Sequence, residues 1–255
     1  MYAGSLTCLV AWGILAFGGV YAWGYVPLTI GASLMGAWSL VTRVRFAHCR
    51  PGPSGWATGG VLCAVLLQLL PLPVDVLRRI SPHTDDFLLK YDLRYAFRAP
   101  GGGVHALSVN PLETFEALVF VCGLVLLAWG VSVSLDNASL RSLVRNLLVL
   151  AVSTAIVGLA QRTFPNGKIY WFWEPEFSAF NAFGPFVNRN HFAGWMLLMT
   201  SLGLGEFCAL VASARIPGEG DWRDRLLWLG GAAGARVLLV GAAVFVMALS
   251  LVWTM

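Results

Sequence analysis

Apolar residues gather along the chain into long blocks that short polar stretches separate. A helix rises about 1.5 Å per residue, so about 20 apolar residues cross the roughly 30 Å of hydrocarbon in a bilayer. The blocks predict seven membrane-spanning helices, over residues 6–26, 27–44, 56–74, 113–134, 143–162, 191–213 and 236–254. The pattern therefore predicts an all-α, polytopic helical membrane protein, with a single membrane domain over residues 1–255.

The first block lies where a secretory signal would lie, but its surroundings differ. No basic residue precedes it, and a second apolar block follows directly from Pro27. A signal peptide needs a basic n-region and ends at a cleavage site, whereas proline suits the first turn of a new helix. We therefore expect a retained first span that forms a tight helical hairpin with the second.

Basic residues in the short loops predict the orientation. They fall in three loops that would lie on one side of the membrane: Arg43, Arg45 and Arg50; Arg141 and Arg145; and Arg215, Arg223 and Arg225. Short cytoplasmic loops carry an excess of Lys and Arg. We therefore expect the N-terminus in the cytoplasm, and segments 75–112 and 163–190 on the exported side.

Composition agrees with a membrane protein and narrows the chemistry. Hydrophobic residues make up 58% of the chain and charged residues only 12%, about half the charged share of soluble domains. The net charge of +4 comes from cations scattered among loops, so no nucleic-acid partner is predicted. The five cysteines form no CxxC motif and no Cys/His spacing for a metal. We expect no cofactor.

The first exported segment predicts surface helices rather than a further span. In VDVLRRISPHTDDFLLKYDL, which begins at Val74, apolar residues recur at helical spacing on one face and charges on the other. Helices of this kind lie at a membrane surface. The same pattern also fits a solvated connector with a buried apolar stripe.

The second exported segment is dense in aromatic residues and carries cations among them. Aromatic rings concentrate at membrane interfaces, and they also stack on sugar faces, while Arg holds phosphate oxygens with a planar fork. Candidate binding residues here are Lys168, Trp171, Trp173 and Arg189. The stretch Glu174-Pro175-Glu176 offers oxygen ligands, but carboxylates in an exported loop are usually solvated, so no metal site is predicted.

Four polar residues, Asn188, Arg189, Asn190 and His191, directly precede the sixth predicted span. The N-terminal end of a helix attracts anions through unpaired N–H groups and its dipole, so these residues fit a diphosphate group. A structural interpretation stays open beside this one. In it, an Asn caps the helix, Arg189 snorkels to lipid phosphates, and His191 satisfies a hydrogen bond.

Residues 184–195, GPFVNRNHFAGW, resemble the signature stretch of the O-antigen ligase/polymerase family of bacterial membrane proteins. Residues 66–82, 107–119 and 158–173 resemble further segments of that family, in the family's order. The resemblance implies a glycosyltransferase-C-like enzyme of the bacterial inner membrane that acts at the periplasmic face without a nucleotide sugar. Its donor would be a glycan on undecaprenyl diphosphate, and its acceptor the lipid A core of lipopolysaccharide, a growing polymer or a protein.

The same resemblance implies roles for single residues. Arg189 would bind the diphosphate, while Asn188 and Asn190 are matched signature positions. Transfer also needs a base for the acceptor's proton, and the candidates are His191, Glu174 and Glu176. Some glycosyltransferases of this architecture hold a divalent cation on acidic residues of the first exported loop. Here that loop is only Tyr25-Val26-Pro27, so metal-independent transfer is expected.

Family members continue for several more spans and a large periplasmic loop, whereas this sequence ends at Met255. We therefore expect the N-terminal portion of a family member, either truncated or completed by a partner that supplies the remaining spans. Two other function classes stay open. A transporter or flippase would place ionisable residues near the middle of the membrane, but Glu116, Arg145, Glu206 and Arg236 lie near predicted span ends. A non-catalytic membrane subunit of a polysaccharide assembly complex would suit the short chain.

Overall fold

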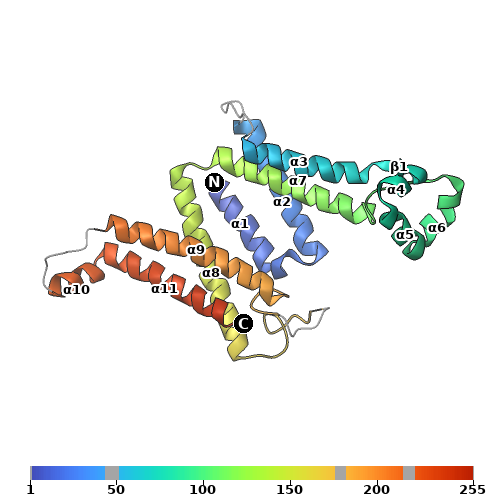
Figure 1. Cartoon of the computed structure of the whole chain (residues 1–255). Coiled ribbons are helices and arrows are strands. Elements are labelled where there is room, and N and C mark those ends of the chain that lie inside the picture. The colour runs from blue at the N-terminus through green and yellow to red at the C-terminus, as the bar shows by residue number, and fades with distance from the viewer. Residues whose placement is uncertain (1, 44–51, 176–181, 215–221, 255) are drawn as a thin grey trace. The chain divides into compact units, whose positions relative to one another are not determined.

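The computed structural model describes residues 2–43, 52–175, 182–214 and 222–254, and the described chain is built almost entirely of helices (Figure 1). Five of them are long and apolar enough to cross a membrane: α2 (Ala22–Arg43), α7 (Pro111–Ser134), α8 (Asn137–Thr163), α9 (Arg189–Ser213) and α11 (Ala232–Val252). Two further apolar helices, α1 (Tyr2–Leu15) and α3 (Pro53–Leu69), are shorter. The prediction of an all-α chain with membrane-length helices is therefore confirmed.

The bounds of the first two predicted spans were wrong. Helix α1 ends at Leu15, and a single 3₁₀ turn, η1 (Phe17–Gly19), leads into α2. Phe17, Gly18 and Gly19 have φ angles of 60°, 71° and 69°, so the chain reverses here in left-handed conformation. The predicted boundary at residue 27 instead falls inside α2, where Pro27 is a helical residue.

The third predicted span, 56–74, was also too long at its end. Helix α3 ends at Leu69, and residues Pro71–Pro73 form the short strand β1. Proline has no N–H to donate and its ring clashes with the preceding helical turn, so the Pro-Leu-Pro sequence cannot continue a helix. The remaining predicted spans overlap α7, α8, α9 and α11, and the largest difference is at α8, which begins at Asn137 instead of residue 143.

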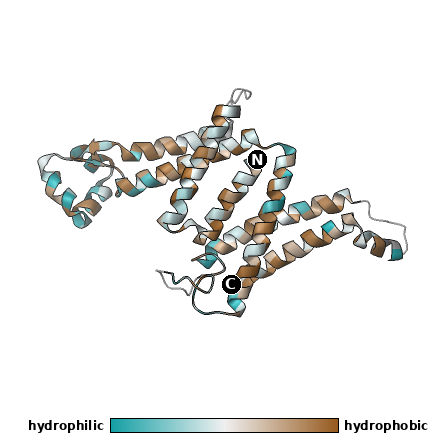
Figure 2. Cartoon of the chain, turned by 180° about the vertical axis from the view of Figure 1, so that it is seen from behind, coloured by the Kyte–Doolittle hydropathy of each residue, from teal (hydrophilic) through white to brown (hydrophobic). Residues whose placement is uncertain are grey.

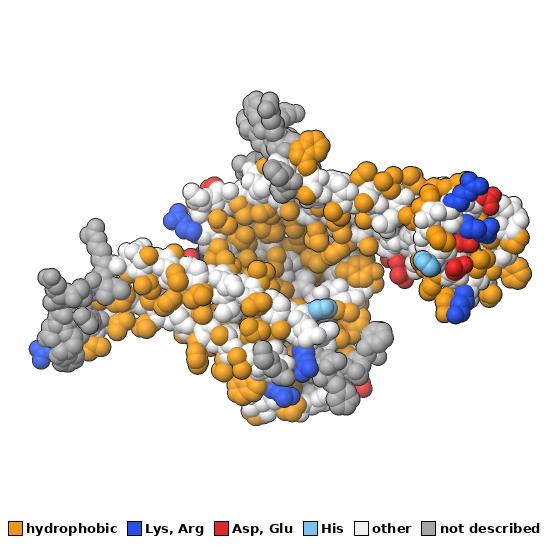
Figure 3. All heavy atoms as spheres, in the orientation of Figure 1, with side chains coloured by type: hydrophobic (Ala, Val, Ile, Leu, Met, Phe, Trp, Pro, Cys, Tyr) orange, Lys and Arg blue, Asp and Glu red, His pale blue; other side chains and the backbone are white. Residues whose placement is uncertain are grey.

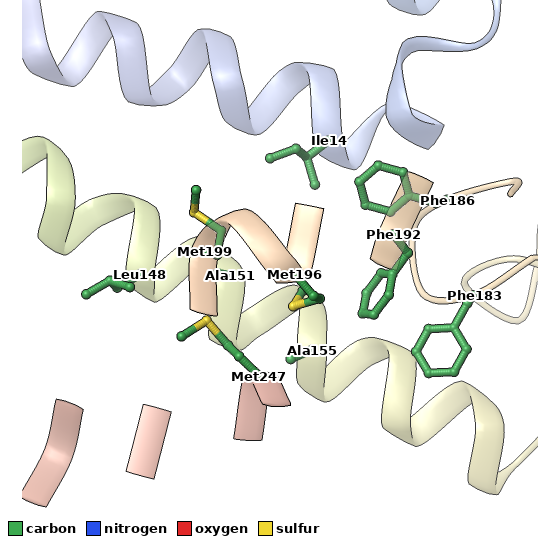
Figure 4. Close-up of a cluster of buried hydrophobic side chains, with 10 residues drawn as sticks. All are labelled: Ile14, Leu148, Ala151, Ala155, Phe183, Phe186, Phe192, Met196, Met199 and Met247. Carbon is green, nitrogen blue, oxygen red and sulfur yellow. The ribbon is translucent and has the colours of Figure 1, made fainter. Parts of the chain in front are cut away.

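The chain divides into two compact units, residues 1–28 with 135–255 and residues 29–134. In the first unit, α9 packs along α11, and α8 packs against α1, α9 and α11. Helix α10 (Trp222–Gly230) precedes α11. The core of this unit gathers residues from α1, α8, α9 and α11 and from the chain before α9, as Figure 4 shows: Ile14, Leu148, Ala151, Ala155, Phe183, Phe186, Phe192, Met196, Met199 and Met247.

In the second unit, a two-stranded sheet joins the end of α3 to the start of α7. Strand β1 pairs antiparallel with β2 (Val104–Ala106), with Leu72 opposite His105. The Ser108 N–H donates to the Gln68 carbonyl at 3.0 Å, which continues the pairing past the strands. Helices α2 and α7 approach closely because Gly36 leaves room for the backbone of Leu126.

The predicted amphipathic segment is helical, as α4 (Val74–Ile80), α5 (Pro82–Tyr91) and α6 (Leu93–Arg98). A short 3₁₀ turn, η3 (Ala99–Gly101), follows. Their apolar faces meet in a small core made of Val74, Leu77, Leu88, Tyr95 and Ala99. Figure 2 shows the contrast with the long helices, since hydrophilic residues concentrate over α4–α6. Charged side chains gather over the same helices in Figure 3.

The small core of α4–α6 also holds one ionised group. Asp85 is only 3% exposed, and its carboxylate accepts from Tyr95 Oη at 2.6 Å and from Arg78 Nε at 2.9 Å. Burial raises the pKa of Asp85, but the hydrogen bonds from Tyr95 and Arg78 and the Arg78 charge outweigh it and hold the pKa below its ordinary value. Burial and the bond to Asp85 raise the pKa of Tyr95 to about 12.

Candidate functional site

A cavity of about 280 Å³ lies in the first unit, where α8 ends and α9 begins. Residues of α8, of the segment after it, of the chain before α9, of the start of α9 and of the chain just after α11 line it. Its described lining consists of Gly158, Gln161, Arg162, Phe164, Pro165, Asn166, Gly167, Lys168, Trp171, Ala182, Phe183, Arg189, Trp253 and Thr254. The cavity therefore sits at one end of a bundle of apolar helices.

Three cations line this cavity. Arg162 lies in the last turn of α8, Lys168 in the segment that follows, and Arg189 is the first residue of α9. The described lining contains no carboxylate. Three positive side chains around one small space make a potential that suits an anion such as a phosphate group.

The position of Arg189 runs against the usual preference of helix ends. The N-terminal end of a helix carries partial positive charge, so acidic residues are favoured in the first turn. The first turn of α9 has none and begins with an arginine. Such a breach of a local rule is expected where function requires it, because an anion placed here would meet the guanidinium and the helix dipole together.

Asn188 has a structural role at the same helix end. It is the N-cap of α9, and its Oδ1 accepts from the Asn190 N–H at 2.8 Å. For Asn188, this hydrogen bond agrees with the interpretation that an asparagine caps the helix. By fixing the first turn of α9, the cap also fixes the backbone from which Arg189 extends.

The segment before the cap is a tight turn held by aromatic packing. Phe183 and Phe186 exchange two backbone hydrogen bonds, of 3.0 and 3.1 Å, across Gly184, which has a φ of 56°. The Phe192 ring lies 4.6 Å from the Phe183 ring and 5.9 Å from the Phe186 ring, between centroids (Figure 4). Gly158 of α8 leaves the space that the Phe183 ring fills. This packing joins the turn before α9 to the last turns of α8.

The segment after α8 contains a strained turn. Phe172 N–H donates to the Ile169 carbonyl at 3.3 Å, and the two residues between them, Tyr170 and Trp171, have φ angles of 52° and 65°. Turns with positive φ at both central residues are normally made by Asn and Gly. Bulky residues in this region cost of order 1–3 kcal/mol each and persist only where the surroundings impose them, often at functional sites.

Side-chain hydrogen bonds impose this turn. Asn166 Nδ2 donates to the Trp171 carbonyl at 2.7 Å, and Trp171 Nε1 donates to the Phe164 carbonyl at 2.8 Å. Tyr170 Oη donates to the Leu15 carbonyl at 2.9 Å, which ties the turn to the end of α1. Burial raises the pKa of Tyr170 to about 12, so its hydroxyl keeps the donated proton at neutral pH. The Trp171 side chain is thereby held at the cavity.

The structure brings together only some of the residues predicted from the sequence. Arg189, Lys168 and Trp171 line one cavity. Trp173 lies instead in an aromatic cluster with Phe17, Tyr21 and Trp23, at centroid distances of 4.9 to 6.0 Å.

The candidate bases also differ in their placement. Asn190 and His191 are exposed and are not part of the described lining. His191 follows Arg189 by two positions, a rotation of about 200° around the helix axis, so the two side chains point to different sides of α9. Glu174 Oε2 lies 3.8 Å from Lys168 Nζ, in an exposed ion pair. Glu176 lies outside the described residues.

The lining residues that were not predicted as site residues include Gln161, Arg162 and Asn166. Arg162 does not stand out in the sequence, because a basic residue is common at a helix C-terminus, where it interacts favourably with the helix dipole. Gln161 and Asn166 are uncharged, and hydrogen bonds join both of them to the Lys168 backbone: Gln161 Nε2 donates to its carbonyl, and Asn166 Oδ1 accepts from its N–H. All three lie in or directly beside the stretch 158–173, which meets the stretch 184–195 at this cavity.

Among the described residues, no three His, Cys, Asp or Glu side chains come together in a group that could hold a metal ion. Comparison of the chain with protein-family models, with curated proteins and with solved structures finds no match.

Proposed function

We propose that the protein binds a glycan carried on a polyprenyl diphosphate, such as undecaprenyl diphosphate, in this cavity and transfers it to an acceptor hydroxyl. The observation that carries the proposal is the meeting of Arg162, Lys168 and Arg189 around one cavity beside Trp171. Cations suit the diphosphate, the ring suits a sugar face, and the adjoining apolar helices suit the polyprenyl chain.

The resemblance to O-antigen ligases and polymerases is the second ground for the proposal. Two of the stretches that resemble the family, 158–173 and 184–195, hold the end of α8 and the start of α9, and residues of both line the cavity.

The proposed reaction is a glycosyl transfer. An acceptor hydroxyl oxygen forms a bond to the anomeric carbon of the donor sugar, and the bond between that carbon and the diphosphate oxygen breaks. The polyprenyl diphosphate leaves with the electron pair, and a base takes the hydroxyl proton. The three cations would stabilise the negative charge that develops on the leaving oxygen.

Glu174 is the better placed of the described candidate bases. Its Oε2 lies 3.8 Å from Nζ of Lys168, a cavity residue, whereas His191 extends from a different side of α9 than Arg189. The base for transfer is therefore proposed to be Glu174, and His191 becomes the alternative.

The proposed orientation follows from the same helices. Arg141 and Arg145 lie at the start of α8, and Arg162 at its end lines the cavity. The excess of basic residues in short cytoplasmic loops would place the start of α8 in the cytoplasm. The cavity would then open toward the periplasmic face of the bacterial inner membrane.

A second candidate is a non-catalytic membrane subunit that binds the same lipid-linked glycan. It is favoured by the make-up of the described lining, in which three cations and several hydrogen-bonding groups surround the space. Such a site is equipped to hold an anionic lipid headgroup whether or not transfer follows.

Deletion of the gene tests whether the protein acts on a lipid-linked glycan, as both candidate functions require. If the proposal holds, the deletion strain accumulates a lipid-linked glycan, and a plasmid-borne wild-type copy clears it. An Arg189→Ala copy, produced at the same level in the membrane, should fail to clear it. Unchanged pools of lipid-linked glycans in the deletion strain would contradict the proposal.

A further inference from the structure

Among the buried side-chain polar atoms of the described cavity residues, one has no hydrogen-bond partner. Gln161 extends from α8 and lines the cavity beside Arg162. Its Nε2 donates to the Lys168 carbonyl at 3.1 Å, which fixes the orientation of the amide. Its Oε1 is buried and has no hydrogen-bond partner among the described residues. Buried acceptors are nearly always paired in native proteins, so an unpaired one at a binding cavity points to a ligand group.

The hydrogen-bonding chemistry of the ligand decides which group can pair with Gln161. The amide oxygen only accepts. The oxygens of an ionised diphosphate also only accept, so they can satisfy Arg162, Lys168 and Arg189 but not Gln161 Oε1. A sugar hydroxyl can donate to it. The cavity thus offers donors for a diphosphate and, on the residue next to Arg162, one acceptor for a hydroxyl.

Trp171 supplies the other half of a sugar site. Its ring lines the same cavity, and its Nε1 is already bonded to the Phe164 carbonyl. The ring is therefore held in one orientation. Because its N–H is already bonded, a ligand would contact the face of the ring. A sugar between Trp171 and Gln161 would stack on the ring and donate a hydroxyl proton to the amide.

We propose that Gln161 is a specificity-determining residue: its Oε1 accepts a hydrogen bond from a hydroxyl of the sugar next to the diphosphate. This inference rests on the proposed function, because it requires the diphosphate to occupy the three cations. It implies that the cavity distinguishes a glycosylated polyprenyl diphosphate from the bare one. Since the bare lipid diphosphate is the product of transfer, losing this bond would favour its release.

Two short-chain ligands test this inference in the full-length protein in nanodiscs: farnesyl diphosphate, and a panel of farnesyl diphosphates that each carry one hexose or N-acetylhexosamine. We expect wild type to bind at least one glycosylated ligand about tenfold more tightly than the bare one, the effect of about one hydrogen bond. Gln161→Met should lower this ratio to about one. Gln161→Glu keeps an acceptor oxygen, so it should keep most of the ratio, although its charge and the loss of the donor to the Lys168 carbonyl weaken the binding of both ligands.

Asn166→Ala is the matched control for damage to the loop. It removes hydrogen bonds to Trp171 and Lys168 but leaves Gln161 Oε1 in place. Both ligands should bind more weakly to it, in a nearly unchanged ratio. A wild-type ratio of one across the panel, or a full ratio in Gln161→Met, would overturn the inference while leaving diphosphate binding intact. Failure of wild type to bind any of the ligands would overturn the proposed function, and this inference with it.

Discussion

Asn166 holds Trp171 and Lys168 with one side chain: its Nδ2 donates to the Trp171 carbonyl at 2.7 Å, and its Oδ1 accepts from the Lys168 N–H at 3.0 Å. The two residues that it holds are the aromatic ring and one of the cations of the candidate cavity. The turn between them carries positive φ angles at Tyr170 and Trp171. Asn166 therefore offsets the backbone strain of the turn that places both side chains at the cavity.

Replacing Asn166 should loosen this turn without unfolding the helices. Two hydrogen bonds are lost in Asn166→Ala, at about 0.5–1.5 kcal/mol each, so residues 166–173 should exchange their amide hydrogens faster than in wild type. Asn166→Asp keeps the acceptor for Lys168 and should have an intermediate effect. Hydrogen exchange in nanodiscs measures this, with α9 as the internal reference. Equal protection of the turn in Asn166→Ala and wild type would show that Asn166 does not hold it.

The long helices could be predicted because an apolar run of about 20 residues has few structural solutions in a membrane protein. The hairpin of α1 and α2 could not be placed in the same way, because both runs are apolar and hydropathy does not mark the turn at Gly18 and Gly19. The pair Gly18-Gly19 is the better signal in the sequence, because glycine tolerates the positive φ angles of this turn. For α3, Pro71 and Pro73 gave the correct end, but the apolar residues between and after them hid it.

The candidate site could be predicted in part for a similar reason. The charge on Arg189 and Lys168 is visible in the sequence, but the direction of a side chain is not. Trp171 and Trp173 are two residues apart, and a strained turn sends one to the cavity and the other to the aromatic cluster around Phe17. Sequence spacing alone contains no sign of that turn, because Tyr and Trp are unusual residues for it.

The N-cap of α9 gives a second test of stability. Asn188→Ala should cost about 0.5–2 kcal/mol, because the Asn190 N–H loses its acceptor. Asn188→Asp keeps a side-chain acceptor and should stay close to wild type. Thermal unfolding of the purified protein, followed by circular dichroism, compares the three. If Asn188→Ala unfolds at the same temperature as wild type, the hydrogen bond of 2.8 Å between the Asn190 N–H and Asn188 Oδ1 adds little to stability.

Acid should weaken the α4–α6 core through Asp85. The folded-state pKa of this carboxylate lies below its ordinary value of about 3.9 in unfolded chains. Its ionised form therefore contributes stability that is present at neutral pH and is lost as pH falls below about 4, through the lower folded-state pKa. Hydrogen exchange of residues 82–98, measured in steps from pH 6 to pH 3, should show protection falling in this window.

Two variants at this core identify the cause. Tyr95→Phe removes a hydrogen bond to a charged group, so the segment should lose about 1.5–3 kcal/mol at neutral pH. Asp85→Asn should lose stability at neutral pH and also lose most of the acid dependence. A wild-type acid profile in Asp85→Asn would assign the effect to another group.

Membrane topology can be tested with single cysteines in a background without the native five. Phe172 is 71% exposed in the segment after α8, and Ala138 is exposed at the start of α8. A membrane-impermeant thiol reagent added to intact spheroplasts should label Phe172→Cys and leave Ala138→Cys unlabelled until the membrane is opened. The reverse pattern would place the cavity on the cytoplasmic side and remove the basis for periplasmic transfer.

The central claim is that Arg189 and its neighbouring cations bind a lipid-linked diphosphate, and the affinity of Arg189→Lys for that ligand tests it most directly. Lysine keeps the charge but loses the planar fork. The full-length protein in nanodiscs should bind undecaprenyl diphosphate carrying a glycan at least tenfold more weakly as Arg189→Lys, and more weakly still as Arg162→Ala with Arg189→Lys. Arg145→Lys is the matched control, since it lies on α8 about 25 Å from Arg162 along the helix axis. Unchanged affinity in both Arg189→Lys and Arg189→Ala, with normal expression and folding, would make Arg189 a membrane anchor and contradict the claim.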